Sequence, residues 1–191
     1  MDSALVRLSK FLSLVLRHAP ERAGVTLDAA GWVDVDALVA GARRAGVALD
    51  RAALERVVRE NDKQRFALSP DGRRVRASQG HSLTVDLGLA PEPPPDTLYH
   101  GTATRNVDAI RREGLRPGRR THVHLSTDAT TAAAVGQRHG RPVVLRVAAG
   151  AMHRAGHAFV RSANGVWLTG AVPPRYLAYP EDPELEDRTS A

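Results

Sequence analysis

Apolar residues in the first part of the chain recur every three or four positions, as they do on the buried face of a helix. The pattern predicts an amphipathic helix that stops before Pro20 and a second that begins at Asp34 or Asp36 and runs to Gly46. A third helix is expected where Asp50 can act as its N-cap. The apolar stripe of the first helix consists of Leu5, Leu8, Leu12, Val15 and Leu16.

Shorter alternating stretches accompany these helices. Trp32-Val33 has the pattern of a short strand, and residues 66–68, the turn 69–72 and Val75 have that of a hairpin with arginines beside its turn. Three short helices followed by such a hairpin resemble a winged helix, a fold that binds nucleic acid in many proteins and other proteins in others.

The second part of the chain alternates differently. A helix over residues 106–113 should end at Gly114, and Thr127 should cap an alanine-rich helix that runs to about His139. Gly156 argues against a helix that would carry both His153 and His157. Strands are expected at residues 98–99, 123–125, 142–147, 158–161, 166–169 and 176–179. The fold class is therefore predicted to be α+β.

Four prolines within residues 91–95 mark the clearest boundary, because proline cannot donate to helix or sheet hydrogen bonds and favours an extended backbone. We expect a winged-helix-like RNA lobe over residues 1–90, a linker over 91–95 and a lobe of short strands over 96–180. Residues 181–191 hold five acids and one arginine and are expected to form an acidic tail.

Composition narrows the function classes. With 42% hydrophobic and 25% charged residues and no long apolar run, the chain is expected to be a cytoplasmic, globular protein without a membrane span, and we expect a monomer. The absence of cysteine excludes thiolate chemistry. The net charge is +6 despite the acidic tail, which favours a polyanionic partner such as nucleic acid. A GC-rich genome would explain the 25 arginines against two lysines, but not the net charge.

Four polar clusters could carry chemistry, at residues 17–21, 78–82, 99–102 and 122–126. Arg17 and His18 end a helix, where cations complement the dipole, and His100 follows an apolar strand as a buried histidine would. His122 and His124 share one face of a strand, but the stretch lacks the further ligands that a metal site needs, so no metal is expected. Neither a Rossmann fingerprint nor a P-loop occurs in the sequence.

Taken together, these clusters resemble the RNA 2′-phosphotransferases of the tRNA-splicing type. The resemblance covers residues 8–180 and implies a winged-helix lobe followed by a lobe like that of ADP-ribosyltransferases. Any single motif is weak evidence for the family, but the occurrence of all seven in this order is specific. The motifs occupy residues 8–21, 31–33, 61–66, 79–82, 99–102, 122–126 and 164–169.

The resemblance implies a cytoplasmic transferase of RNA repair or tRNA splicing that moves an internal RNA 2′-phosphate to NAD⁺ as co-substrate. The phosphate oxygen would displace nicotinamide, and the ribose 2″-hydroxyl would then attack the phosphorus and release ADP-ribose 1″,2″-cyclic phosphate. Arg17, Arg65 and Arg138 would clamp the phosphate, because the planar guanidinium binds phosphate bidentately. His18 would act as hydrogen-bond donor or acid. Arg141 competes with Arg138 for the third position, and the clamp would be complete only when both lobes close on the substrates.

For NAD⁺, the resemblance implies contacts from His100, Gly101 and Thr102 on one strand and from His124 and Ser126 on the next. Val166 occupies the position at which many ADP-ribosyltransferases carry a glutamate that holds the ribose 2″-hydroxyl. Its absence suits a reaction in which that hydroxyl becomes a nucleophile.

Two other functions fit the same residues. One is an ADP-ribosyltransferase that caps a terminal nucleic-acid phosphate, and the other is a winged-helix regulator with an NAD-sensing lobe. The role of Gly80-His81-Ser82, within the cleft or as a tether, is open at this stage.

Overall fold

The computed structural model describes residues 3–180, which fall into two compact units. Of the described residues, the first unit contains those up to Leu89 together with Arg119–Thr121 and Ser162–Asn164, and the second contains the others. The acidic tail over 181–191 lies outside the described residues. No helix within residues 3–180 is both long enough and apolar enough to cross a membrane.

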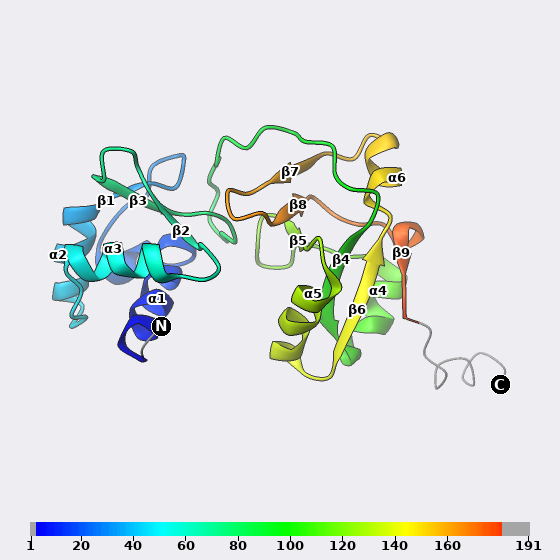
Figure 1. Cartoon of the computed structure of the whole chain (residues 1–191), viewed down its shortest axis with the longest axis horizontal. Coiled ribbons are helices and arrows are strands. Elements are labelled where there is room, and N and C mark those ends of the chain that lie inside the picture. The colour runs from blue at the N-terminus through cyan, green and yellow to red at the C-terminus, as the bar shows by residue number, and fades with distance from the viewer. Residues whose placement is uncertain (1–2, 181–191) are drawn as a thin grey trace. The chain divides into compact units, whose positions relative to one another are not determined.

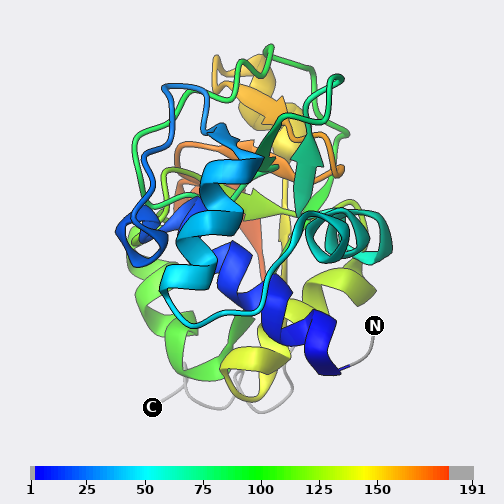
Figure 2. The same cartoon turned by 90° about the vertical axis from the view of Figure 1, so that its left-hand side faces the viewer.

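The helices of the first unit begin where the sequence supplies caps. Asp34 accepts a hydrogen bond from the Ala37 amide at 2.8 Å, so of the two predicted alternatives Asp34, and not Asp36, caps the second helix. Asp50 accepts one from the Ala53 amide at 2.7 Å, which confirms the predicted cap of the third helix. Figure 2 faces this unit and shows the first helix between the other two. The helices are α1 (Ser3–Arg17), the 3-10 helix η1 (Pro20–Ala23), α2 (Val35–Arg44) and α3 (Arg51–Glu60).

The predicted strands of the first unit form one antiparallel sheet. Its strands are β1 (Val33–Asp34), β2 (Phe66–Leu68) and β3 (Arg74–Ala77), in the order β1-β3-β2. The predicted apolar stripe of α1 packs with the inward residues of this sheet in one core, in which Leu12, Leu16 and Val75 are fully buried. The core fixes the C-terminal end of α1, where Arg17 lies.

The second unit contains two three-stranded antiparallel sheets. Tyr99 and Ser126 exchange backbone hydrogen bonds of 2.8 and 2.9 Å and so join a strand of one sheet to a strand of the other. One sheet has the order β4-β6-β9, with β4 (Leu98–Ala103), β6 (Pro142–Val147) and β9 (Leu177–Ala178). The other has the order β5-β8-β7, with β5 (Val123–Leu125), β8 (Trp167–Thr169) and β7 (Phe159–Arg161).

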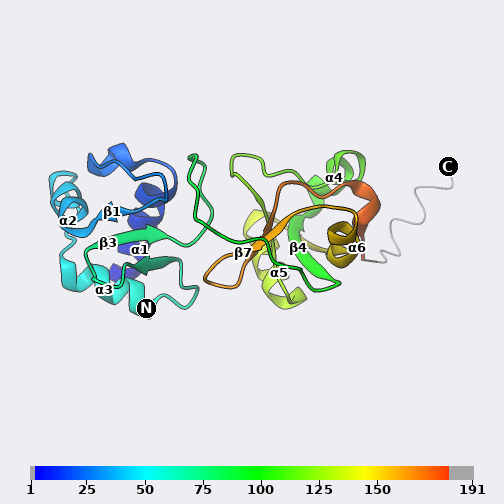
Figure 3. The ribbon, with the colours of Figure 1, turned by 90° about the horizontal axis from the view of Figure 1, so that it is seen from above.

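An alanine-rich helix covers β4 (Figures 1 and 3). Its N-cap is Asp128, which accepts a hydrogen bond from the Thr131 amide at 2.6 Å, so the expectation that Thr127 caps it is wrong. A helix at 149–154, which the sequence did not predict, carries His153 and ends before Gly156. The helices of this unit are η2 (Thr104–Asn106), α4 (Val107–Glu113), α5 (Ala129–Gly136), η3 (Gln137–His139), α6 (Ala149–Arg154) and η4 (Pro174–Tyr176).

The architecture confirms the coarse prediction of a mixed α+β fold with small antiparallel sheets. The finer likenesses, to a winged helix and to ADP-ribosyltransferases, stay predictions.

Candidate functional site

Arg17 is a charged side chain held inside the first unit. It is the last residue of α1, only 9% of its surface is exposed, and its Nε and Nη2 atoms are buried without a hydrogen-bond partner. Burial, followed by the positive charges of Arg65 and Arg120, lowers the pKa of its guanidinium to about 10. A buried cation with unsatisfied donors and cationic neighbours is a strong site for an anion.

The segment 80–82 packs directly on Arg17. Gly80 has φ +88°, and a Cβ atom there would lie 3.5 Å from Nη1 of Arg17 and 3.6 Å from its Cζ. The Ser82 amide donates to the Arg17 carbonyl oxygen at 3.0 Å. This motif, whose role the sequence left open, therefore lies within the first unit against the arginine and fixes its backbone.

His18 lies beside Arg17 on the solvent side. Its Nδ1 is 2.9 Å from the Ser82 hydroxyl, which itself donates to the Arg17 carbonyl oxygen at 3.4 Å. With the hydroxyl proton used in that bond, the hydroxyl oxygen accepts from Nδ1–H, so Nε2 is left as the functional atom. Partial burial, then the charges of Arg17 and Arg120, lower the pKa of His18, so the ring is mainly neutral at pH 7.

His81 is buried near Arg17 and His18. Its side chain is 1% exposed, and its Nε2 is buried without a partner. Burial, followed by the charges of Arg17 and His18, lowers its pKa to about 4. The ring is therefore neutral at physiological pH and adds no charge to the site.

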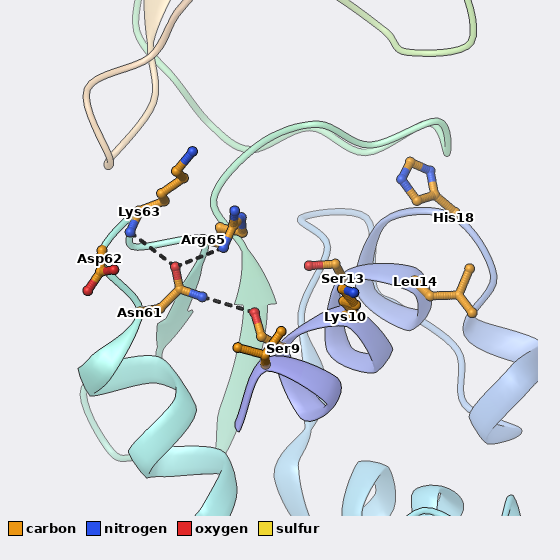
Figure 4. A pocket seen from close by; sticks show the side chains of 10 residues that line it. Ser9, Lys10, Ser13, Leu14, His18, Asn61, Asp62, Lys63 and Arg65 are labelled. Atoms are coloured by element: carbon orange, nitrogen blue, oxygen red, sulfur yellow. Dashed lines mark hydrogen bonds between the residues drawn. The ribbon is translucent and has the colours of Figure 1, made fainter. Parts of the chain in front are cut away.

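Arg65 lies on the loop between α3 and β2, where it borders a pocket of about 660 Å³ (Figure 4). One wall of this pocket comes from α1 and includes Lys10, and another comes from the loop and includes Lys63. These are the only two lysines in the sequence. Arg65 donates from Nη1 to the side-chain oxygen of Asn61 at 3.3 Å. The pocket thus gathers lysine, arginine and His18 on one surface of the first unit.

The candidate residues on β4 and β5 meet in the second unit. His100 Nδ1 lies 3.0 Å from the His124 carbonyl oxygen, and His124 Nδ1 lies 2.9 Å from the His122 carbonyl oxygen. A carbonyl can only accept, so both rings carry their proton on Nδ1 in the neutral form. Leu125 and Trp167 form the last pair of the β5–β8 ladder, so Ser126 just after β5 and Val166 just before β8 lie at the same end of this sheet.

Gly101 and Thr102 lie farther along β4. A Cβ atom on Gly101 would overlap the Ala132 carbonyl oxygen of α5, so close helix packing requires a glycine there whatever its part in ligand binding. The Thr102 hydroxyl accepts a hydrogen bond from the Asn106 amide group at 3.2 Å. These contacts fix the strand that carries His100.

Arg138 lies on η3 and Arg141 just after it, both in the second unit and both exposed. The Arg141 carbonyl oxygen accepts from the Thr104 amide and hydroxyl at 3.0 and 3.2 Å. Neither contact decides which arginine serves the clamp, and that choice stays a prediction. Within residues 3–180 there is no group of three or more histidine, aspartate or glutamate side chains that could hold a metal ion.

Several residues that organise the site were not among the sequence-based candidates. Ser82 and Gly80 belong to a motif whose role was open, and Asn61 belongs to the motif that contains Arg65. Arg120 precedes the predicted strand at 123–125 and carried no signal of its own. Ser9 lies on the predicted helix, but nothing in the neighbouring sequence distinguishes it from a helix residue without a role in the site.

Comparison with known proteins provides independent information. Residues 3–171 match the model of a family described as RNA 2′-phosphotransferase, Tpt1 / KptA family. A protein of Hahella chejuensis named "Probable RNA 2′-phosphotransferase" is 60% identical over 178 residues, which cover 93% of this chain and 96% of the relative. Proteins with the same name from Agrobacterium fabrum and Streptomyces griseus are 60% and 58% identical and cover 94% and 90% of this chain and 96% and 95% of the relatives.

Proposed function

The chain belongs to the RNA 2′-phosphotransferase family of the Tpt1 / KptA type, and from this membership we propose that it transfers an internal RNA 2′-phosphate to NAD⁺. The products would be nicotinamide, ADP-ribose 1″,2″-cyclic phosphate and RNA with a free 2′-hydroxyl. The observation that carries the proposal is the buried Arg17 guanidinium, whose Nε and Nη2 have no partner in the protein.

A phosphate monoester suits this arginine better than a phosphodiester does. A dianion offers three terminal oxygens and two charges, and two buried N–H groups on one edge of a guanidinium match two of those oxygens. The positive charges of Arg65 and Arg120 also repel that of Arg17 and contribute to its lowered pKa. A dianion between these cations would replace repulsion by attraction.

In the first step, a phosphate oxygen would form a bond to C1″ of the nicotinamide ribose as the bond to nicotinamide breaks. The nucleophile is already charged, so the protein contributes orientation more than proton removal. Arg17 and Arg65 would hold the phosphate by two of its oxygens and leave the third to react. No general base is required.

In the second step, the ribose 2″-hydroxyl would attack the phosphorus and lose its proton, while the bond to the RNA 2′-oxygen breaks and that oxygen gains a proton. The proposed donor of the second proton is Nε2 of His18, because Nδ1 is engaged with Ser82. His18 is mainly neutral in the free protein, since burial, Arg17 and Arg120 lower its pKa. A bound phosphate dianion would raise that pKa again and so prepare His18 as an acid.

The residues proposed for NAD⁺ lie on β4 and β5 of the second unit. In the neutral form His100 and His124 carry their protons on Nδ1, so Nε2 would be the ring atom that accepts from a ribose hydroxyl. Val166, just before β8, provides no carboxylate to hold the 2″-hydroxyl, so that hydroxyl would stay available as the second nucleophile. We propose Arg138 as the third arginine of the clamp.

Product analysis tests this function. The protein is incubated with NAD⁺ and either a short RNA that bears one internal 2′-phosphate or the same RNA without it. Nicotinamide release that depends on the 2′-phosphate, with the cyclic phosphate as nucleotide product, is expected. A stable ADP-ribosylated RNA end would instead identify a capping ADP-ribosyltransferase, and duplex binding without nicotinamide release would identify a regulator.

A further inference from the structure

A hydrogen-bond network centred on Asn61 holds Arg65 (Figure 4). The Asn61 side-chain oxygen accepts from Arg65 Nη1 at 3.3 Å and from the Lys63 amide at 3.1 Å. Its Nδ2 donates to the Ser9 hydroxyl at 3.1 Å. Asn61 is 2% exposed and Ser9 is 5% exposed, so water does not compete for these bonds. The side chain therefore connects α1 to the loop that carries Arg65.

The orientation of this amide is determined by its partners. A backbone amide can only donate, and so can a guanidinium, so both Lys63 and Arg65 require the oxygen of Asn61. The nitrogen must then face Ser9, whose hydroxyl oxygen can accept. A buried serine on α1 thus fixes which end of the amide points to Arg65.

The backbone of the same loop is fixed from both sides. The Gln64 amide donates to the Asn61 carbonyl oxygen at 2.7 Å, and Gln64 has φ +42°, the single positive value at a non-glycine position among the described residues. Ser78, which directly follows β3, donates from its amide to the Arg65 carbonyl oxygen at 2.9 Å and from its hydroxyl to the Gln64 carbonyl oxygen at 3.0 Å. A left-handed residue held by such bonds indicates that the loop conformation is specified rather than incidental.

The side chain that accepts from Arg65 Nη1 in this network is an amide, although a carboxylate would bind a guanidinium more strongly. A carboxylate at this position would form an ion pair with Arg65 and offset the charge that a phosphate must meet. A neutral oxygen directs the guanidinium without cancelling its charge. The only atomic difference between the two side chains is the amide nitrogen, which is the atom that Ser9 accepts from.

We propose that Asn61, oriented by Ser9, is a neutral positioning residue for the phosphate-binding guanidinium of Arg65. The proposal rests on the proposed function, because it takes the ligand of Arg65 to be the RNA 2′-phosphate. Asn61 itself acts through Arg65 and has no contact with the substrate in this role.

The test compares Asn61→Asp and Ser9→Ala with the wild-type protein. Asn61→Asp keeps an oxygen for Lys63 and Arg65, and the Ser9 hydroxyl can donate to the new carboxylate, so the fold is retained. The control is Ala52→Asp, which adds the same charge to the exposed first turn of α3, at the opposite end of that helix. The probes are a trinucleotide RNA with one internal 2′-phosphate and its unphosphorylated twin, which is the same trinucleotide without that phosphate. The affinity of each protein for each RNA is measured by titration without NAD⁺.

For Asn61→Asp, the expected result is an affinity for the phosphorylated RNA about five- to tenfold lower, from competition by a partly buried ion pair. Its affinity for the unphosphorylated twin should not change, and Ala52→Asp should bind both RNAs like the wild-type protein. Ser9→Ala removes the partner of Nδ2, keeps the neutral oxygen and should weaken binding of the phosphorylated RNA by about threefold. In turnover, Asn61→Asp should raise the KM for RNA and leave the KM for NAD⁺ unchanged.

Two results would overturn the proposal. One is equal affinity of Asn61→Asp and wild-type protein for the phosphorylated RNA, and the other is an equal loss for both RNAs, which would signal a purely structural role. If Asn61→Asp does not fold, Ser9→Ala decides by the same comparison. Failure of the proposed function gives a different result, because the wild-type protein itself would then not distinguish the two RNAs or would not release nicotinamide.

Discussion

The neutral, buried His81 near Arg17 should make the first unit sensitive to mild acid. Its pKa is about 4 in the folded protein, because it is buried beside cations, against an ordinary value of 6.5. Between these two pH values the unfolded chain binds a proton that the folded chain does not. The contribution of His81 to the free energy of unfolding is therefore fully present above pH 6.5. It decreases as the pH falls from 6.5 to 4.

Linkage gives the size of this effect. From pH 7 to pH 5 the shift from 6.5 to about 4 removes at most about 2 kcal/mol from the free energy of unfolding. His81→Gln keeps a polar side chain of similar reach that does not titrate, so this variant should lose about 2 kcal/mol less than the wild-type protein over the same interval.

The assay is urea unfolding followed by circular dichroism at pH 7 and pH 5 for both proteins. The comparison cancels the titration of carboxylates and of the other histidines, because both proteins share them. His81→Gln has its own cost at pH 7, so the quantity that matters is the change between the two pH values. An identical change in the two proteins would refute the assignment of a neutral, buried His81.

Other predictions concern the site residues. Arg65→Ala should reduce kcat/KM by at least about a hundredfold through loss of a phosphate ligand, measured by nicotinamide release, with unchanged unfolding. His18→Ala should slow the second step more than the first, so that a branched ADP-ribosylated RNA accumulates in gels; equal loss of both steps would remove its role as acid. Arg138→Ala should lower turnover far more than Arg141→Ala, and the reverse order would transfer the third clamp position to Arg141. Gly101→Ala should destabilise the second unit by about 1–3 kcal/mol in thermal unfolding, because its methyl group would overlap the backbone of α5.

Local patterns were sufficient to predict most elements of the fold. The caps at Asp34 and Asp50 and the strands at 123–125 and 142–147 depend on neighbouring residues, and the structure has them as expected. The error at Thr127 arose because two cap-forming residues are adjacent, and only the contact with Thr131 distinguishes them.

The elements that the sequence did not predict depend on distant contacts. Helix α6 contains Gly150, whose amide donates to the Asp96 carbonyl oxygen at 3.1 Å. A glycine lowers helix propensity, and a partner 54 residues away leaves no periodic signal.

In the candidate site, too, local motifs could be predicted from the sequence and contacts between distant residues could not. Arg17 and Arg65 were identifiable from their motifs, but the contact between His18 and Ser82 spans 64 positions, and that between Ser9 and Asn61 spans 52. Contacts between side chains so far apart cannot be derived from helical or strand periodicity. The burial of Arg17 depends on tertiary packing and cannot be derived from its position in the sequence.

The most direct test of phosphate transfer follows the phosphorus itself. An RNA that carries ³²P only in one internal 2′-phosphate is mixed with an equal amount of protein, with and without NAD⁺, and the labelled products are separated. The account predicts that the label moves, only when NAD⁺ is present, into ADP-ribose 1″,2″-cyclic phosphate. Label that remains on the RNA, or that appears as inorganic phosphate without NAD⁺, would contradict it.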